Sequence, residues 1–300
     1  MHYPLFLVSI FLLLTISYDF FFSVISINGA GPISSRLSAL ISTVFLRLSC
    51  LSKSRKILKY SGAIVILSLI IWWIGGLWLG FYLLILSDDH SVFTASTGIM
   101  ADVSDKFYYS GYVLSTMGNG DFVPGSSRWQ IVIAVFSFSG FIFITTAMTY
   151  LISVSSAVIH KRSLALFITD MIVLDDYVDK VNCLNANAAD LRSMINRHNQ
   201  NHLAYPVVHY FFSMDKETSF SFGLWELNNL LLSIQNNSAD FPHKLKPLIH
   251  AVDNYLNTMS EAFIPRVQKD KKSEKVSLDD FRKQQLLKLL KSDGWNLKVH

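Results

Sequence analysis

The stretch DKFYYSGYVLSTMGNGDFVP, residues Asp105–Pro124, decides the fold of this chain. It lies between two long apolar runs, Tyr60–Leu86 and Trp129–Ile159. An aromatic segment of helical character, about Ser104–Ser115, is followed by two glycines that alternate with other residues. Glycine reaches backbone conformations that are closed to other residues, so this alternation can turn successive carbonyls towards one axis. A ring of such oxygens from several copies can replace the water shell of a monovalent cation.

The stretch resembles the pore loop of the potassium-channel superfamily, whose selectivity filter reads T-V-G-Y-G-D. Six consecutive residues take the positions of that filter: Thr116, Met117, Gly118, Asn119, Gly120 and Asp121. Met117 and Asn119 replace the family's Val and Tyr, and the other residues are identical to the pattern. The resemblance spans roughly Tyr60–His160 and covers neither the first apolar segment nor the C-terminal domain.

The resemblance implies that the carbonyls of residues 116–119 and the Thr116 hydroxyl coordinate potassium, while the Met117 side chain points away from the axis into packing. In the family, the tyrosine at the position of Asn119 packs on pore-helix aromatics and holds the filter taut. With asparagine this brace is either lost or remade by hydrogen bonds with the pore-helix tyrosines, which are Tyr108, Tyr109 and Tyr112. We therefore expect a cation channel that conducts potassium and discriminates less strictly against sodium, with no cofactor besides the transported ion.

Gating features are expected in the last apolar run. By the same register, Gly140 falls on the family's gating-hinge glycine, although glycine in membrane helices also permits close packing. Three threonines, Thr145, Thr146 and Thr149, lie in the inner half of the run, where they would line a water-filled cavity. The alternative is that their hydroxyls bond the preceding turn of their own helix.

Composition indicates an all-α membrane protein, because 51% of the 300 residues are hydrophobic and only 16% are charged. A bilayer-spanning helix needs about 20 apolar residues, and three runs of that length are present: Pro4–Ile27, Tyr60–Leu86 and Trp129–Ile159. We expect an N-terminal transmembrane helix (1–27), a basic cytosolic or interfacial segment (28–59), a pore domain (60–160), a helical cytosolic domain (161–265) and a basic linker with a C-terminal amphipathic helix (266–300). Retention of the first run is favoured over a cleaved signal peptide, because its start carries no Lys or Arg.

Basic flanks predict the topology. Arg and Lys before Tyr60 and after Ile159 belong on the cytoplasmic side, so the N-terminus and the pore loop lie outside and the C-terminus inside, in a bacterial inner membrane by analogy. The external segment carries Asp88, Asp89, Asp102 and Asp105, which either concentrate cations or are ordinary solvated acids. Ile33–Lys59 suits a helix in the membrane interface, or a core-facing helix of the cytosolic part.

Other polar residues have plainer interpretations. Asp19 within the first run is costly in lipid, and it is either a functional carboxylate or a satisfied packing contact. Five histidines lack metal-ligand spacing and are interpreted as surface or core residues: His198, His202, His209, His243 and His250. In the second half we expect helices over Leu164–Val181, Ala186–Asn196, Phe222–Gln235, Leu245–Phe263 and Leu278–Ser292. The last could dock on a partner, on the membrane surface or on its own domain.

A single pore loop cannot enclose a conduction path, so we expect a homotetramer in membrane lipid. A regulatory ligand or partner of the cytosolic domain is not identifiable from the sequence. The competing interpretation is a membrane-anchored interaction or sensor protein whose pore no longer conducts. An enzyme is the least supported class, because no paired carboxylates, nucleophile elbow or phosphate loop occurs in the second half. Nucleic-acid binding is not expected, because there is no basic face interleaved with aromatics.

Overall fold

The computed structural model describes residues 2–26, 29–237, 242–263 and 278–295. The described residues are mostly helical, which agrees with the expected all-α membrane protein. They divide into two compact units: a first unit of Met1–Leu40 and Ala63–Ser153, and a second unit of Ile41–Gly62 and Val154–His300. The basic linker expected at the start of segment 266–300 lies outside the described residues.

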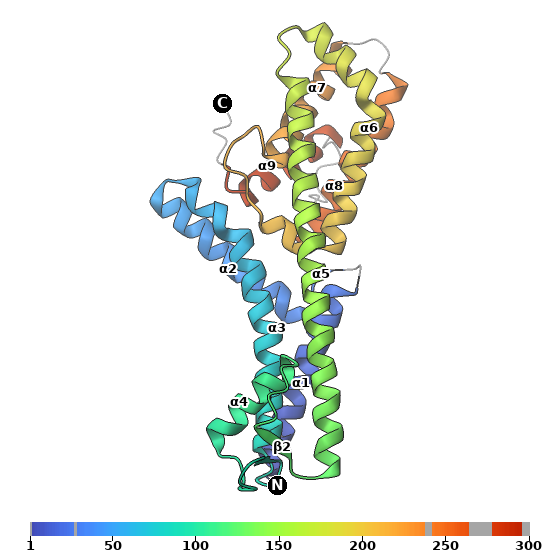
Figure 1. Ribbon diagram of the computed structural model, residues 1–300. Helices are drawn as coiled ribbons and strands as arrows, with labels where there is room; N and C mark the ends of the chain where they lie inside the picture. Colours follow the sequence, from blue (N-terminus) through green and yellow to red (C-terminus); the bar gives the residue numbers. More distant parts are fainter. Residues whose placement is uncertain (1, 27–28, 238–241, 264–277, 296–300) are drawn as a thin grey trace, which may run out of the picture. The chain divides into compact units, whose positions relative to one another are not determined.

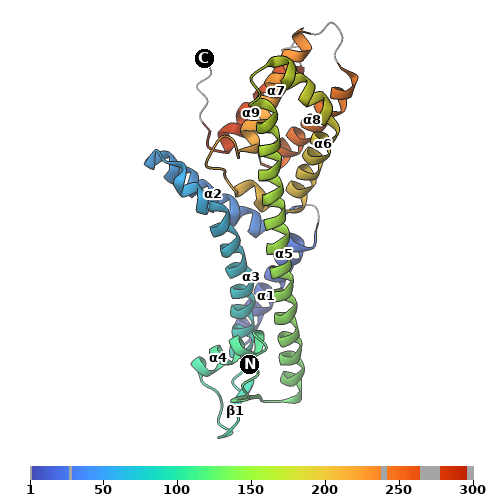
Figure 2. The ribbon, with the colours of Figure 1, turned by 45° about the horizontal axis from the view of Figure 1, so that its top comes forward.

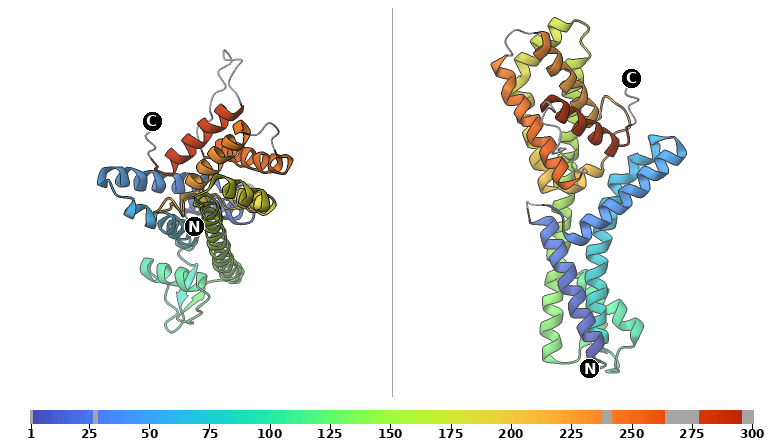
Figure 3. Two further views of the ribbon diagram at one scale, coloured as in Figure 1. Left: turned by 90° about the horizontal axis from the view of Figure 1, so that it is seen from above. Right: turned by 180° about the vertical axis from the view of Figure 1, so that it is seen from behind.

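In the first unit, helix α1 (Tyr3–Val24) lies between α3 (Ser61–Leu86) and the first part of α5 (Ser127–Ile172), as the view from behind shows (Figure 3). Gly76 and Gly80 of α3 allow the close approach: a Cβ built on them would lie 2.5 and 2.6 Å from side-chain atoms of α1. Such small-residue pairs are typical of packed membrane helices.

Asp19 of α1 is wholly buried and holds the beginning of α2 (Pro32–Ser52). Its carboxylate accepts hydrogen bonds from the main-chain N–H groups of Ile33 (2.9 Å) and Ser34 (3.1 Å), and from the indoles of Trp72 and Trp73 (both 3.3 Å). The first N–H groups of a helix have no partner within the helix, and the helix dipole favours a negative charge there. The hydrogen bonds of the Asp19 carboxylate are therefore satisfied within the protein, as the packing interpretation predicted.

Four helices of the described residues are long and apolar enough to cross a membrane: Tyr3–Val24, Pro32–Ser52, Arg55–Leu86 and Ser127–Ile172. Three of them contain the expected spans, and α2 is the addition. α5 also differs from expectation, because it runs without a break through His160-Lys161-Arg162, where we expected one helix to end and another to begin. No proline or glycine occurs between residues 141 and 172 to stop it.

A two-stranded antiparallel sheet, which the sequence analysis did not predict, lies at the end of the first unit that also holds α4 (Val103–Leu114; Figure 1). β1 (Val92–Thr94) pairs with β2 (Phe122–Pro124), with Phe93 opposite Val123. The pairing joins the segment after α3 to the segment that follows the glycine-rich loop. It therefore fixes one end of that loop.

The second unit is a helical bundle in which α6 (Tyr177–Ala204), α7 (Phe220–Asn237), α8 (Lys246–Ala262) and α9 (Leu278–Ser292) pack around the C-terminal part of α5 (Figure 2). The expected helices Ala186–Asn196, Phe222–Gln235 and Leu278–Ser292 lie within these elements, and Leu245–Phe263 agrees with α8 to within one residue at each end. The expected helix Leu164–Val181 is wrong, because α5 ends at Ile172 and α6 begins only at Tyr177. Leu286 and Leu289 of α9 are buried in the core, so this helix docks on its own domain.

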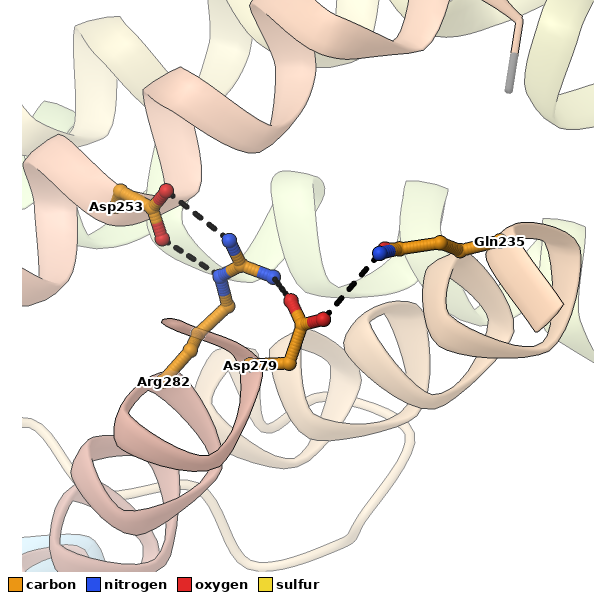
Figure 4. A network of polar contacts seen from close by, with 4 residues as sticks. All are labelled: Gln235, Asp253, Asp279 and Arg282. Carbon is orange, nitrogen blue, oxygen red and sulfur yellow. Dashed lines mark hydrogen bonds and ion pairs between the residues drawn. The ribbon is translucent and has the colours of Figure 1, made fainter. Parts of the chain in front are cut away.

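A polar network fixes the start of α9. Arg282 is almost buried and forms a bidentate pair with Asp253 of α8, at 2.6 and 3.1 Å (Figure 4). Its remaining nitrogen reaches Asp279 at 3.1 Å, and Asp279 accepts a hydrogen bond from Gln235 of α7. Planar bidentate pairs of this kind give geometric specificity, so the network sets the position of α9 against α7 and α8.

Another arginine connects the start of η1 (Arg55–Tyr60), the short helix before α3, to the end of α9. The Arg55 guanidinium donates to the carbonyls of Gly294 (2.7 Å), Asp293 (3.0 Å) and Ser213 (2.8 Å). It also lies 3.7 Å from the centre of the Trp295 ring. A cation is favourable at a helix C-terminus, so Arg55 acts as a cap supplied from a distant part of the chain.

Candidate functional site

The site begins with α4, whose bounds Val103–Leu114 agree with the expected pore helix. Asp102 and Asp105 form a reciprocal capping box at its N-terminus, with hydrogen bonds of 2.7 and 3.2 Å. This arrangement satisfies free N–H groups and places negative charge at the positive end of the dipole. The opposite, negative end of α4 leads directly into the glycine-rich loop.

The loop has alternating backbone handedness. Thr116, Gly118 and Gly120 have φ angles of +59°, +62° and +83°. Glycine adopts such angles without steric cost, whereas a β-branched residue such as threonine is strained there. Strain at a non-glycine residue is characteristic of functional sites in which the surroundings fix the conformation. Every second residue thus has the left-handed conformation that the glycine pattern predicted.

The loop carbonyls are free within the chain. Among the hydrogen bonds of the described residues, none is accepted by a carbonyl of residues 116–120. The loop is nevertheless fixed at both ends: the Met117 N–H donates to the Tyr112 carbonyl (3.0 Å), and the Asp121 carbonyl accepts from the Ala95 N–H (2.9 Å). Residues 116–120 are exposed in the single chain. Their carbonyl oxygens are therefore available to other partners on a loop that is held at both ends.

Asn119 is bound to the pore helix. Its side-chain amide donates a hydrogen bond to the phenol oxygen of Tyr108, which is the second of the two alternatives considered for the brace. Tyr108 in turn packs edge-to-face on Tyr112 (5.3 Å between ring centres), and the Tyr112 hydroxyl donates to the Phe122 carbonyl (3.2 Å). Tyr109 is buried and also contacts Tyr112 (5.1 Å). The expected tyrosines thus form one cluster behind the loop.

Met117 does not have the packed position that we expected. Its side chain is 59% exposed, so within the described part of the chain it has no enclosing contacts.

Gly140 lies where α5 touches the end of α4. A Cβ built on Gly140 would be 2.1 Å from the carbonyl oxygen of Leu114, far inside contact distance. α5 is continuous through this position. The structure therefore assigns Gly140 a close-packing role, and bending at this residue stays a prediction.

The three threonines of α5 lie one to two turns beyond Gly140. Thr145 and Thr149 are exposed and Thr146 is partly buried. The Thr145 hydroxyl donates to the Phe141 carbonyl (2.8 Å), and that of Thr149 donates to the Thr145 carbonyl (3.0 Å). The alternative interpretation, bonding to the preceding turn, is thus observed for these two residues, and their place in a cavity stays a prediction.

The acidic residues that follow α3 have local structural partners. Asp88 accepts hydrogen bonds from the Trp129 indole (2.9 Å) and the His90 N–H (3.2 Å). Burial raises the pKa of the Asp88 carboxyl, but these hydrogen bonds outweigh it and the pKa lies below its usual value. Lys106 of α4 donates to the carbonyls of Asp88 (2.8 Å) and Asp89 (3.3 Å). These contacts hold α4 to the segment after α3.

Sequence reasoning missed the capping box and the anchoring of α4 by Lys106. The first had a readable signal, since an acidic residue three positions after Asp102 matches a capping pattern. The second depends on carbonyls some 18 residues away and leaves no such pattern. Among the described residues, no cluster of His, Cys, Asp and Glu could hold a metal ion.

Comparisons with known proteins find an ion-channel domain and a related membrane protein. The protein family described as "Ion channel" matches residues 65–156. The "Uncharacterized membrane protein YdjJ" of Bacillus subtilis (strain 168) is 31% identical over 252 residues, covering 79% of this chain and 72% of the relative. No solved structure matches the chain.

Proposed function

The chain belongs to the family of membrane proteins that includes YdjJ of Bacillus subtilis and carries an ion-channel domain, and from this premise we propose that it is a cation channel that conducts potassium. Its selectivity against sodium is relaxed, because asparagine replaces the family's filter tyrosine. The site residues are the filter, residues 116–121, backed by Tyr108, Tyr109 and Tyr112.

One observation carries the proposal: the alternating left-handed residues of the loop and its unpartnered carbonyls. A dehydrating cation needs oxygens that are held in place and not already hydrogen-bonded. The negative end of α4 adds a favourable field at the same place. The Asn119–Tyr108 hydrogen bond supports a filter that is still braced.

The conducting form is a homotetramer. The exposed filter is accompanied by exposed apolar residues along the first part of α5, at positions 131, 135, 138 and 141. An apolar helix face of this kind is covered either by lipid or by another subunit. Only an assembly of subunits around a central axis brings several filters together. Native mass spectrometry of the detergent-solubilised protein is expected to show four copies.

A flux measurement tests conduction. Purified protein in liposomes with a potassium gradient is expected to show potassium flux, with a smaller sodium flux. Gly118→Ala should abolish it, because alanine is strained at a φ of +62°. Gly98→Ala is the matched control: its φ is +66° and, as at Gly118, an added Cβ meets nothing within 4 Å, but it lies outside the filter.

A folded tetramer without cation flux would contradict the proposal and favour the non-conducting anchor. Equal loss of flux in the Gly98→Ala and Gly118→Ala proteins would contradict the role of the filter.

The proposed orientation places the pore loop outside and the second unit inside, in a bacterial inner membrane. Basic residues before α3 and after Ile159 support it. The side of the membrane on which the N-terminus lies then shows whether α2 crosses the membrane. An external N-terminus means that α2 lies in the membrane interface, and an internal N-terminus means that α2 spans the membrane. Labelling of a single cysteine placed near His2 by an impermeant reagent distinguishes the two.

A further inference from the structure

A group of histidines is buried in the second unit, away from the filter. His198 and His202 of α6 and His209 of η2 (Pro206–Tyr210) are 0%, 1% and 6% exposed. The ring centres of His198 and His202 lie 4.6 Å apart, and those of His202 and His209 lie 6.0 Å apart. We call these three residues the histidine cluster.

The polar atoms of the cluster are unusual for a protein interior. Both ring nitrogens of His198 and both of His202 are buried without a hydrogen-bond partner among the described residues. Buried polar groups are nearly always hydrogen-bonded, and each exception calls for an explanation. Aromatic rings surround them instead: Phe220 lies 4.6 Å from His198, and Phe263 lies 4.6 Å from His209. These surroundings accept neutral imidazole and oppose its charged form.

Charged and titratable groups face the cluster from each neighbouring element. They are His160 and Lys161 of α5, Tyr210 of η2, Tyr255 of α8 and Asp293 at the end of α9. Lys161 is buried too, and its ammonium donates to the carbonyls of Phe211 (3.0 Å) and Val208 (3.4 Å). A buried ammonium beside neutral histidines makes a further proton costly, and burial also lowers the pKa of Lys161 itself.

Burial is the main cause of a pKa well below the usual range for His198 and His202, and the charge of Lys161 lowers both further. For His209, burial outweighs the opposing effect of Asp293 and lowers the pKa to about 4. A folded state that binds fewer protons than the unfolded chain is fully stable above the unfolded pKa, near 6.5, and loses stability as the pH falls below it. The cluster is therefore sensitive to acid and not to base.

The position of the cluster connects it to α5. His160 of α5 contacts the Met194 carbonyl of α6 at 3.0 Å, and its ring centre lies 6.4 Å from that of His198. α6 packs in turn beside α8, as two views show (Figures 1 and 2). α5 is also the helix that carries Gly140 and the threonines at its other end. Loosening of α6 would thus remove support from α5, and α5 is the helix whose Gly140 contacts the end of α4.

We propose that the histidine cluster is a proton-binding site whose protonation releases α6 from α5, so that acid on the side of the second unit changes channel activity. The release of α6 stands on the geometry of the second unit, and its effect on activity rests on the proposed function.

The first test needs no substitution. In the full-length protein, hydrogen exchange at the imidazole C2 position, followed by mass spectrometry, gives the pKa of each histidine. His250, which is exposed on α8, serves as the reference histidine, whereas His198 and His202 are not protonated until α6 opens. Titration of both near pH 6.5 with α6 still protected would overturn the proposal.

The second test follows amide exchange of α6 between pH 7.5 and 5.5, corrected for the chemical rate. Opening is expected to increase by about tenfold per histidine, roughly a hundredfold for His198 and His202 together, because each takes up one proton on opening. A His198→Leu/His202→Leu protein should lose this response, and His250→Gln should retain it. An unchanged response in the double variant would contradict the proposal.

Potassium flux is then measured over the same pH range. A change of flux in the wild-type protein that is absent from the double variant supports the coupling. If no flux occurs at any pH but α6 still opens in acid, the proposed function fails and the proton-binding site stands. If flux occurs and neither α6 nor flux responds to acid, the proton-binding site fails alone.

Discussion

The amide of Asn119 donates a hydrogen bond to the phenol oxygen of Tyr108, which lies eleven residues earlier on the pore helix. This contact joins the middle of the glycine-rich loop to a rigid helix within one chain. In the proposed filter, it takes the place of the aromatic packing that a tyrosine at this position would provide. Selectivity should therefore depend on one polar contact.

Tyr108→Phe is expected to lower the preference for potassium over sodium several-fold while leaving the fold intact. The substitution removes the acceptor for Asn119 but keeps the ring that packs on Tyr112, and a neutral hydrogen bond contributes about 1 kcal/mol. Liposome flux under equal potassium and sodium gradients measures the ratio. Tyr18→Phe, at an exposed tyrosine of α1, is the control. An unchanged ratio would show that this contact does not hold the filter.

Gly140→Ala is expected to lower the stability of the assembly by about 1–3 kcal/mol, the usual cost of overpacking. Its Cβ would lie 2.1 Å from the Leu114 carbonyl oxygen, so the end of the pore helix must move. Gly75→Ala is the matched control on α3, because a Cβ there meets nothing within 4 Å. Thermal unfolding in detergent compares the two. A variant with normal stability and altered open time would instead indicate a hinge.

Helix α4 and the left-handed Gly118 and Gly120 were predictable from sequence, because the alternation of glycine in residues 116–121 acts locally on the backbone. The anchoring of α4 by Lys106 was not, because it depends on main-chain carbonyls of a distant segment. The cap on the end of α9 was not predictable either, because Arg55 and Gly294 are 239 residues apart and nothing in the sequence pairs them. The uninterrupted course of α5 was also missed: the basic residues after Ile159 mark a membrane boundary but do not stop a helix. The packed position expected for the Met117 side chain is not observed among the described residues, where this side chain is exposed.

Asp19→Asn is expected to reduce the free energy of unfolding by about 3 kcal/mol, since it removes a charge that accepts several buried hydrogen bonds. One oxygen that accepts from Ser34, Trp72 and Trp73 can become an NH₂ group, which cannot accept. Asp89→Asn at an exposed aspartate is the control. Reversible denaturation in detergent gives both values. Equal stabilities would mean that the carboxylate does not hold α2 in place.

Arg55→Gln is expected to release the end of α9 while the rest of the second unit stays folded. The guanidinium caps the carbonyls of Asp293 and Gly294 and stacks on Trp295, and charged hydrogen bonds of this type contribute about 1.5–3 kcal/mol each. Amide exchange should therefore rise at least tenfold in the last turn of α9, but not at its start, where the Arg282 network is untouched. Lys56→Gln, at the next residue, is the control. Because Arg55 begins η1, which directly precedes α3, the same variant should also alter potassium flux if α9 transmits a signal to the pore. Normal flux with a released α9 would show that this connection supports the fold alone.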